Sequence, residues 1–189
     1  MNFTSKLVLA SNSPRRQELL TKLGLNYTVR VKEVEESFPE HLHRHEIAEY
    51  LAGKKAAAYR ESLAENEVLL TADTIVCLED KVLNKPADLN EARTMLRSLS
   101  GKAHEVITGV CLLSRPNKVI FHDVTRVYFK ELSEAEITWY LEKYQPYDKA
   151  GAYGAQDWMG MAAIYRLEGS FYNVMGLPVH KVYEALQSF

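Results

Sequence analysis

The spacing of apolar residues changes twice near the start of the chain and predicts a strand, a turn and a helix. An apolar run over residues 7–10 is typical of a buried strand, and the leucines within residues 19–23 recur at helical spacing. Between them, Ser13 is a good N-cap and Pro14 suits the first helical position. We therefore predict a helix that begins at this pair and ends at Gly24.

The rest of the pattern predicts an alternating chain that gives way to hairpins. Two sequence pairs, Asp88 with Glu91 and Ser133 with Glu136, match the capping box of a helix start. Because strands and helices alternate first, we predict one α/β domain over residues 1–189, with a mixed, strongly twisted sheet and its ligand at the carboxyl ends of strands. Strands are expected at 27–31, 68–78, 106–113, 119–129, 162–167 and 170–175, and helices at about 46–63, 88–99, 133–144 and 178–186.

The first polar turn is a candidate anion site. Arg15 and Arg16 lie in the first turn of the predicted helix, where unpaired N–H groups and the helix dipole already favour an anion. A cation there is unfavourable by roughly 0.3–1 kcal/mol. Both arginines could simply extend into water, but two of them on a serine-rich turn favour a bound anion. The turn is not a P-loop, because it has neither the glycines nor the Gly-Lys-Ser/Thr ending.

Asp73 interrupts an otherwise apolar strand together with Thr74. An unpaired charge in such a strand costs several kcal/mol, so this carboxylate is either hydrogen-bonded for structure or functional. We favour function, because the pair is expected at a junction of two strands. A carboxylate facing a cleft could hold a divalent metal or take a proton from water.

Other charged groups have two interpretations each. The carboxylates within residues 33–36 form either an exposed acidic turn or part of a divalent-metal site. Lys54 and Lys55 are either a charged helix face or include one residue that reaches a phosphate, and Lys85 is either an exposed turn residue or a second such cation. The histidines at 41, 43 and 45 are interpreted as a solvated loop, because no ligand set is completed around them.

A glycine- and alanine-rich stretch, residues 147–156, is suited to close approach of a ligand. Its last residue, Gln156, offers both a donor and an acceptor, which suits reading the edge of a base. Together with the anion site and the buried carboxylate, this stretch suggests a nucleotide phosphohydrolase.

Composition narrows the class of partner. The chain has 189 residues with 47% hydrophobic and 25% charged positions, which is typical of a soluble globular protein. A net charge of −2 argues against nucleic acid as a partner. Cys77 and Cys111 lie in apolar runs and are expected as buried thiols in a reducing compartment. We find no signal peptide and no membrane span, so a cytoplasmic location is expected.

Six motifs, in order along nearly the whole chain, resemble the Maf family of nucleoside triphosphate pyrophosphatases. This resemblance implies a metal-dependent cytoplasmic enzyme that cleaves a nucleoside triphosphate between its α- and β-phosphates. It also implies a fold similar to that of inosine triphosphatase, with two lobes around a cleft, and a homodimer. The motifs are Ala-Ser-Asn-Ser-Pro-Arg-Arg-Gln-Glu-Leu-Leu at 10–20, Ala-Asp-Thr-Ile-Val at 72–76, Asn-Lys-Pro at 84–86, Leu-Ser-Gly-Lys-Ala-His at 99–104, Asp-Lys-Ala-Gly-Ala-Tyr-Gly-Ala-Gln at 148–156 and Met-Gly-Leu-Pro at 175–178.

The resemblance also implies roles for particular residues. The resemblance implies that Asp73 is the proton acceptor. It also implies that Asp73 and Glu36 together hold the divalent metal, Mg²⁺ or Mn²⁺. The selectivity positions of the family hold arginine, threonine and glutamine in its dTTP/UTP branch, as this chain does, whereas the branch that prefers 7-methyl-GTP has Trp, Gln and Glu. Phosphate-contacting positions fall on Ser11, Arg15, Arg16, Lys55 and Lys85, and the selectivity positions on Arg15, Thr74 and Gln156.

Two positions depart from the family pattern, and two other functions are compatible with the same motifs. Thr71 replaces a common glycine, and residues 157–159 replace a glycine-rich continuation after Gln156. One alternative function is a nucleotide-binding regulator of cell division without significant turnover. The other is removal of modified pyrimidine triphosphates at the same site.

Overall fold

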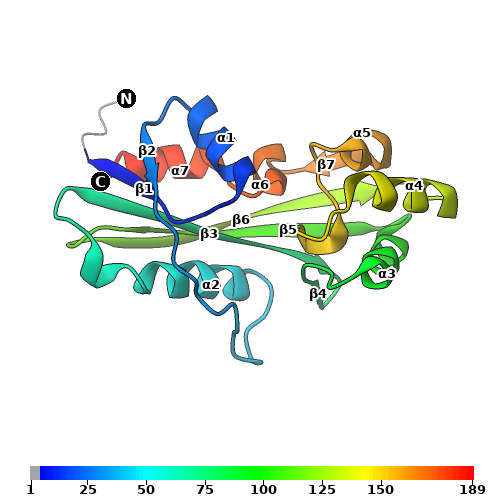
Figure 1. The fold of residues 1–189 in the computed structure, drawn as a ribbon, viewed down its shortest axis with the longest axis horizontal. Coiled ribbons are helices and arrows are strands. Elements are labelled where there is room, and N and C mark those ends of the chain that lie inside the picture. Colours follow the sequence, from blue (N-terminus) through cyan, green and yellow to red (C-terminus); the bar gives the residue numbers. More distant parts are fainter. Residues whose placement is uncertain (1–4) are drawn as a thin grey trace. The chain divides into compact units, whose positions relative to one another are not determined.

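The computed structural model describes residues 5–189 and has a mixed seven-stranded sheet flanked by helices (Figure 1). The predicted α/β class and mixed sheet are thereby confirmed. Along the main path the strand order is β2-β1-β3-β5-β6-β7, and β4 pairs with β3. The strands are β1 (Lys6–Leu9), β2 (Tyr27–Val29), β3 (Glu67–Leu78), β4 (Lys81–Leu83), β5 (Ala103–Leu113), β6 (Lys118–Phe129) and β7 (Ile164–Glu168).

Seven α-helices and two short 3₁₀ turns lie between and after these strands within the described residues. None of these helices combines the length and the apolar character needed to cross a bilayer. Residues 1–4, part of the stretch that was searched for a signal peptide, lie outside the described residues. The helices are α1 (Pro14–Lys22), α2 (His45–Ala57), α3 (Leu89–Leu99), α4 (Glu134–Tyr144), α5 (Trp158–Ala163), α6 (Phe171–Met175) and α7 (Val179–Leu186), and the 3₁₀ turns are η1 (Arg60–Ser62) and η2 (Ala150–Ala152).

The chain divides into two compact units, each made from separate segments. Unit 1 comprises described residues up to Thr74, then 108–123 and 176–189, and unit 2 comprises 75–107 and 124–175. The long strands β3, β5 and β6 contribute residues to both units.

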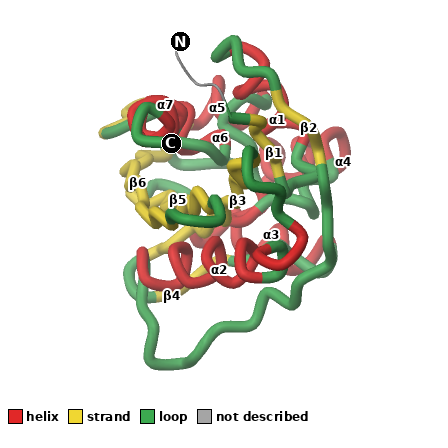
Figure 2. Tube along the Cα trace, turned by 90° about the vertical axis from the view of Figure 1, so that its left-hand side faces the viewer, coloured by secondary structure: helices red, strands yellow, loops and turns green. Residues whose placement is uncertain are grey.

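Unit 1 has a parallel arrangement in which β1 lies between β2 and β3. Figures 1 and 2 show α2 on one face of its strands and α1 and α7 on the other. Leu69 of β3 and Ala52 of α2 are fully buried, as is Cys111 of β5. This layered packing follows from apolar strands whose two faces must both be covered.

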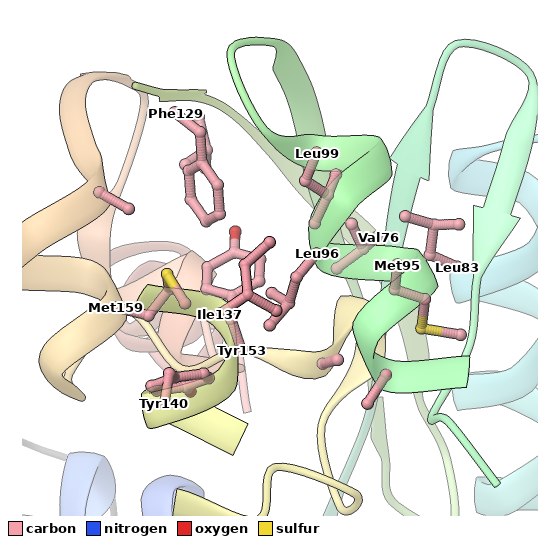
Figure 3. Close-up of a cluster of buried hydrophobic side chains, with 14 of the residues drawn as sticks. Val76, Leu83, Met95, Leu96, Leu99, Phe129, Ile137, Tyr140, Tyr153 and Met159 are labelled. Atoms are coloured by element: carbon pink, nitrogen blue, oxygen red, sulfur yellow. The ribbon is translucent and has the colours of Figure 1, made fainter. Parts of the chain in front are cut away.

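Unit 2 is built around a core to which α3, α4 and α5 all contribute (Figure 3). Leu96 of α3 and Tyr140 of α4 are fully buried, and Phe129 of β6 is 1% exposed. Phe129 meets Tyr153 edge to face, with ring centroids 4.9 Å apart. The buried face of α3 consists of Ala92, Met95, Leu96 and Leu99, and all four are in this core.

The predicted capping box of α4 is present in full. The Ser133 hydroxyl accepts from the Glu136 N–H at 3.3 Å, and the Glu136 carboxylate accepts from the Ser133 N–H at 2.8 Å. At α3 the box is only half formed, because the Glu91 carboxylate accepts from the Ala87 N–H instead of the Asp88 N–H.

Ser133→Ala is expected to lower the free energy of unfolding by about 1 kcal/mol, since the N-cap acceptor is lost. Urea denaturation measures this change, with Ser188→Ala at an exposed position near the C-terminus as the control. Equal stability of the two variants would contradict the capping role of Ser133.

Two predicted elements end earlier in the structure than expected. The helix predicted over 46–63 stops at Ala57, because Tyr59 turns into the core and its hydroxyl hydrogen-bonds the backbone of Arg30 and Lys32. Its alanines do not form one packed side either, since Ala56 is buried whereas residues 57 and 58 are exposed. The strand predicted over 27–31 ends at Val29.

The predicted hairpin across Glu168–Gly169 is wrong. Residues 164–168 form β7, but the following stretch is the helix α6. A buried asparagine explains the difference: the Asn173 amide donates to the Val106 carbonyl and to the Thr125 hydroxyl, both at 3.0 Å. These partners are distant in sequence, so the local pattern did not predict the helix.

Other corrections concern single positions. Asp73 and Thr74 lie inside one continuous strand, β3, and not at a junction of two strands. Val29 and Val31, apolar positions of the strand predicted over 27–31, are each 44% exposed and form no buried face. Tyr183 on α7 is 42% exposed and does not belong to the buried face of this helix.

Candidate active site

The turn between β1 and α1 has the predicted geometry. Ser13 caps α1 by accepting from the Arg16 N–H at 3.4 Å, and Pro14 is the first helical residue. The Ser11 hydroxyl in turn accepts from the Ser13 N–H at 3.2 Å. The turn therefore presents a helix N-terminus with its serines already engaged with the backbone.

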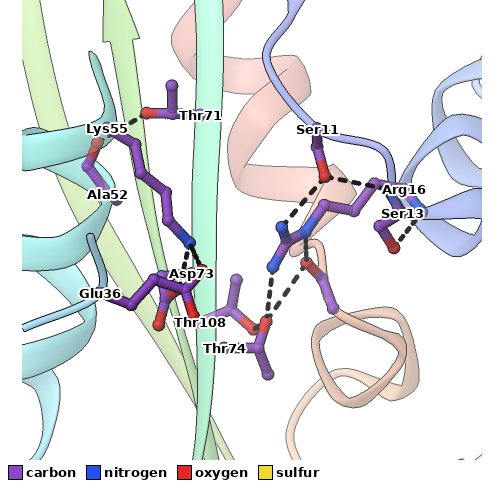
Figure 4. A network of polar contacts seen from close by, with 11 residues as sticks. Ser11, Ser13, Arg16, Glu36, Ala52, Lys55, Thr71, Asp73, Thr74 and Thr108 are labelled. Carbon is purple, nitrogen blue, oxygen red and sulfur yellow. Dashed lines mark hydrogen bonds and ion pairs between the residues drawn. The ribbon is translucent and has the colours of Figure 1, made fainter. Parts of the chain in front are cut away.

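Arg16 does not extend into water but is held by three acceptors from separate parts of unit 1 (Figure 4). Its guanidinium donates to the Gly176 carbonyl at 2.9 Å, to the Thr74 hydroxyl at 3.1 Å and to the Ser11 hydroxyl at 3.3 Å. Burial lowers the pKa of this guanidinium, the Asp73 carboxylate acts in the opposite direction, and the adjacent Arg15 lowers the pKa further. Arginine nevertheless stays charged in proteins.

On the other side of β3, two carboxylates converge on one lysine (Figure 4). The Lys55 ammonium on α2 lies 2.5 Å from the Asp73 carboxylate of β3 and 2.7 Å from the Glu36 carboxylate. Asp73 is only 8% exposed, and the lysine satisfies the charge that the sequence left unexplained. The acidic run at 33–36 is thus both exposed and, through Glu36, part of the candidate site.

The segment that carries Glu36 has no regular structure and is held by side chains of α2 and the residues after it. Lys54 donates to the carbonyl and the hydroxyl of Ser37, both at 2.9 Å. The Tyr59 hydroxyl accepts from the Lys32 N–H at 2.5 Å. The two adjacent lysines therefore differ, because Lys54 anchors the segment whereas Lys55 enters the site.

Thr108 is a residue that sequence reasoning missed. It is fully buried on β5, and its hydroxyl lies 2.9 Å from that of Thr74. The signal was present, because Thr108 interrupts the apolar run 106–113 just as Asp73 and Thr74 interrupt theirs. Thr71, the departure from the family pattern on β3, donates to the Ala52 carbonyl at 2.8 Å and so fastens β3 to α2.

Lys85 and Gln156 belong to unit 2, where both are exposed. The Gly151 N–H donates to the Asn84 carbonyl at 3.3 Å, which ties the 147–156 stretch to the residue before Lys85. Trp158 packs with its ring centroid 4.8 Å from that of Trp139.

The residues present fit a divalent metal that arrives with a phosphate-bearing ligand. Among the described residues no group of three or more His, Cys, Asp or Glu side chains is arranged to hold a metal, and His41, His43 and His45 are exposed. The convergent carboxylates of Glu36 and Asp73 supply oxygen donors, and Mg²⁺ commonly takes one or two carboxylates and completes its shell with water and phosphate oxygens.

Comparison with known proteins gives the chain its family. A family model described as Maf-like protein matches residues 6–189. Proteins named dTTP/UTP pyrophosphatase are similar along nearly the whole chain: the one from Bacteroides fragilis is 51% identical and covers 96% of this chain and 95% of its own length. Those from Parabacteroides distasonis and Flavobacterium johnsoniae are 49% and 50% identical, covering 97% and 96% of this chain and 96% and 93% of their own lengths.

Among solved structures, the Ham1 protein of Staphylococcus aureus aligns with a TM-score of 0.48 and 14% identity over 66% of this chain and 71% of its own. The family model and the relatives, taken with the motifs along the sequence, lead to one conclusion: this chain belongs to the Maf-like protein family.

Proposed function

We propose that this protein hydrolyses dTTP and UTP between the α- and β-phosphates and releases the nucleoside monophosphate and pyrophosphate. Relatives of about 50% identity with that activity in their names support the substrate class. The observation that carries the proposal is the meeting of Asp73, Glu36 and Lys55 in unit 1, where the next residue of the strand, Thr74, accepts from Arg16. No observation on the described residues favours the regulator.

In this proposal the cations neutralise the polyanion. Arg15 and Arg16 lie at the N-terminus of α1, where the backbone also favours phosphate, and Ser11 adds a hydroxyl. Lys55 contributes further positive charge to the triphosphate, and Lys85 occupies a phosphate-contacting position of the family. Donors arranged before the reaction stabilise the charge that develops on the phosphates without reorganising at that moment.

Asp73 acts as the base. Its carboxylate takes a proton from water as the water oxygen adds to the α-phosphorus. The anhydride bond to the β-phosphate then breaks, and pyrophosphate leaves with the bonding electrons. When bound, Mg²⁺ or Mn²⁺ at Glu36 and Asp73 supplies charge neutralisation at the phosphate oxygens. Arg15, Thr74 and Gln156 occupy the family's selectivity positions, and modified pyrimidine triphosphates are alternative substrates of the same site. The family resemblance further supports a cytoplasmic homodimer.

The test is pyrophosphate release from dTTP, UTP, CTP, 7-methyl-GTP and inosine triphosphate. We expect dTTP and UTP to be turned over at least about tenfold faster than the others. A site that hydrogen-bonds one kind of base rejects bases that leave its polar groups unpaired. EDTA should abolish release, and excess Mg²⁺ or Mn²⁺ should restore it. Binding of nucleotides without release from any of them would instead support the regulator.

A further inference from the structure

The selectivity position Thr74 has its hydroxyl turned toward Arg16 and Thr108 in unit 1 (Figure 4). We propose that Thr74 and Thr108 are positioning residues that hold the Arg16 guanidinium for the triphosphate. Residue 74 then acts on the phosphate end of the substrate through Arg16 and not by contact with the base. This inference rests on the proposed function, because it concerns the same substrate.

The hydrogen-bonding capacity of the Thr74 hydroxyl supports this assignment. A hydroxyl has one proton to donate and two lone pairs. One lone pair accepts from Arg16 at 3.1 Å, and the proton has the Thr108 hydroxyl at 2.9 Å and the Gly176 carbonyl at 3.5 Å within reach. A nucleobase that accepted a hydrogen bond from this hydroxyl would compete with these contacts.

The network is rigid, because its partners are buried or conformationally restricted and come from separate segments of the chain. Thr108 is fully buried on β5, the strand next to β3, so its hydroxyl is a fixed partner for that of Thr74. Gly176 has a φ of +115°, a conformation that favours glycine, and its carbonyl accepts from Arg16 at 2.9 Å. Arg16 is therefore restrained by the turn after β1, by β3 and by the segment before α7.

Two N–H groups of Arg16, one on each terminal nitrogen, remain after these contacts and can donate to phosphate oxygens. Within residues 5–189 the guanidinium uses three of its five N–H donors. A restrained arginine loses less conformational freedom when it binds phosphate than a mobile one does. Loss of the restraint should therefore weaken phosphate binding whatever base is attached.

Inorganic tripolyphosphate, which has no base, tests the proposal as a competitive inhibitor of dTTP hydrolysis. For Thr74→Val we expect the inhibition constant of tripolyphosphate and the KM values for dTTP and UTP to rise by the same factor. That factor is about fivefold, the order expected when binding must immobilise one additional side chain. We expect kcat to change less than about twofold, because the lost interaction stabilises the bound substrate and the transition state equally. Thr108→Val should raise all three constants together by a smaller factor.

Conservative variants and a matched control complete the test. Thr74→Ser keeps the hydroxyl and should restore all three constants, and it remains informative if Thr74→Val folds poorly. Thr94→Val, at an exposed position of α3 in unit 2, should leave them unchanged. In an Arg16→Lys background, Thr108→Val should no longer raise these constants, because its effect passes through Arg16.

Two results would overturn the proposal. One is a raised KM for dTTP in Thr74→Val with an unchanged inhibition constant for tripolyphosphate, which would mean that residue 74 contacts the base. The other is no change in either constant. Failure of the proposed function would be seen separately, as no pyrophosphate release by the unmodified protein. Calorimetric binding of tripolyphosphate would then still measure the effect of Thr74→Val.

Discussion

Asp73→Asn is expected to lower kcat for dTTP about a thousandfold, the middle of the range for loss of a general base. An amide has nearly the shape of a carboxylate but does not accept the proton of the attacking water. Its carbonyl oxygen can still accept from Lys55, which lies 2.5 Å from the carboxylate in the structure. Pyrophosphate release measures kcat, and calorimetry should show that nucleotide still binds.

Asp80→Asn is the matched control for this substitution. Asp80 is exposed in the turn between β3 and β4, so the same chemical change there should leave turnover unaltered. If Asp73→Asn unfolded more easily in urea but hydrolysed dTTP at the unmodified rate, Asp73 would be a structural partner of Lys55 and not the base.

Gly109→Ala is expected to destabilise the fold by about 3 kcal/mol, the upper part of the range for overpacking. A Cβ at this position of β5 would lie 2.3 Å from the carbonyl carbon and oxygen of Ala48 in α2. These are backbone atoms, so relief requires α2 to move away from the sheet and not merely a change of rotamer. Urea denaturation followed by circular dichroism measures the change.

Gly53→Ala, a substitution on α2 itself, provides the comparison. Its Cβ would meet the end of the Ile120 side chain at 3.1 Å, and that side chain can adjust. Alanine also favours a helix over glycine by up to about 1 kcal/mol, so stability should be kept or raised. Equal destabilisation by both substitutions would contradict the close approach of α2 at Gly109. Because Lys55 is on α2, Gly109→Ala should also weaken turnover.

The sequence by itself determined the local features of this protein. The cap at Ser13, the capping box at Ser133 and the buried stripe of α3 depend on neighbours within a few residues, and all are present. The apolar runs fixed β1, β3, β5 and β6 for the same reason. Motif order along the chain was equally visible and led to the family that the comparisons establish.

Tertiary structure alone decided how these pieces meet. The C-terminal end of α2 and the helical state of 171–175 depend on hydrogen bonds of Tyr59 and Asn173 to residues far away in sequence. In the site, Lys55 joins Glu36 to Asp73, and Thr108 supports Arg16 through Thr74. A charge or hydroxyl in a strand signals that a partner must exist, because burial without one is costly. Only the packing of α2 and of neighbouring strands determines which residue that partner is.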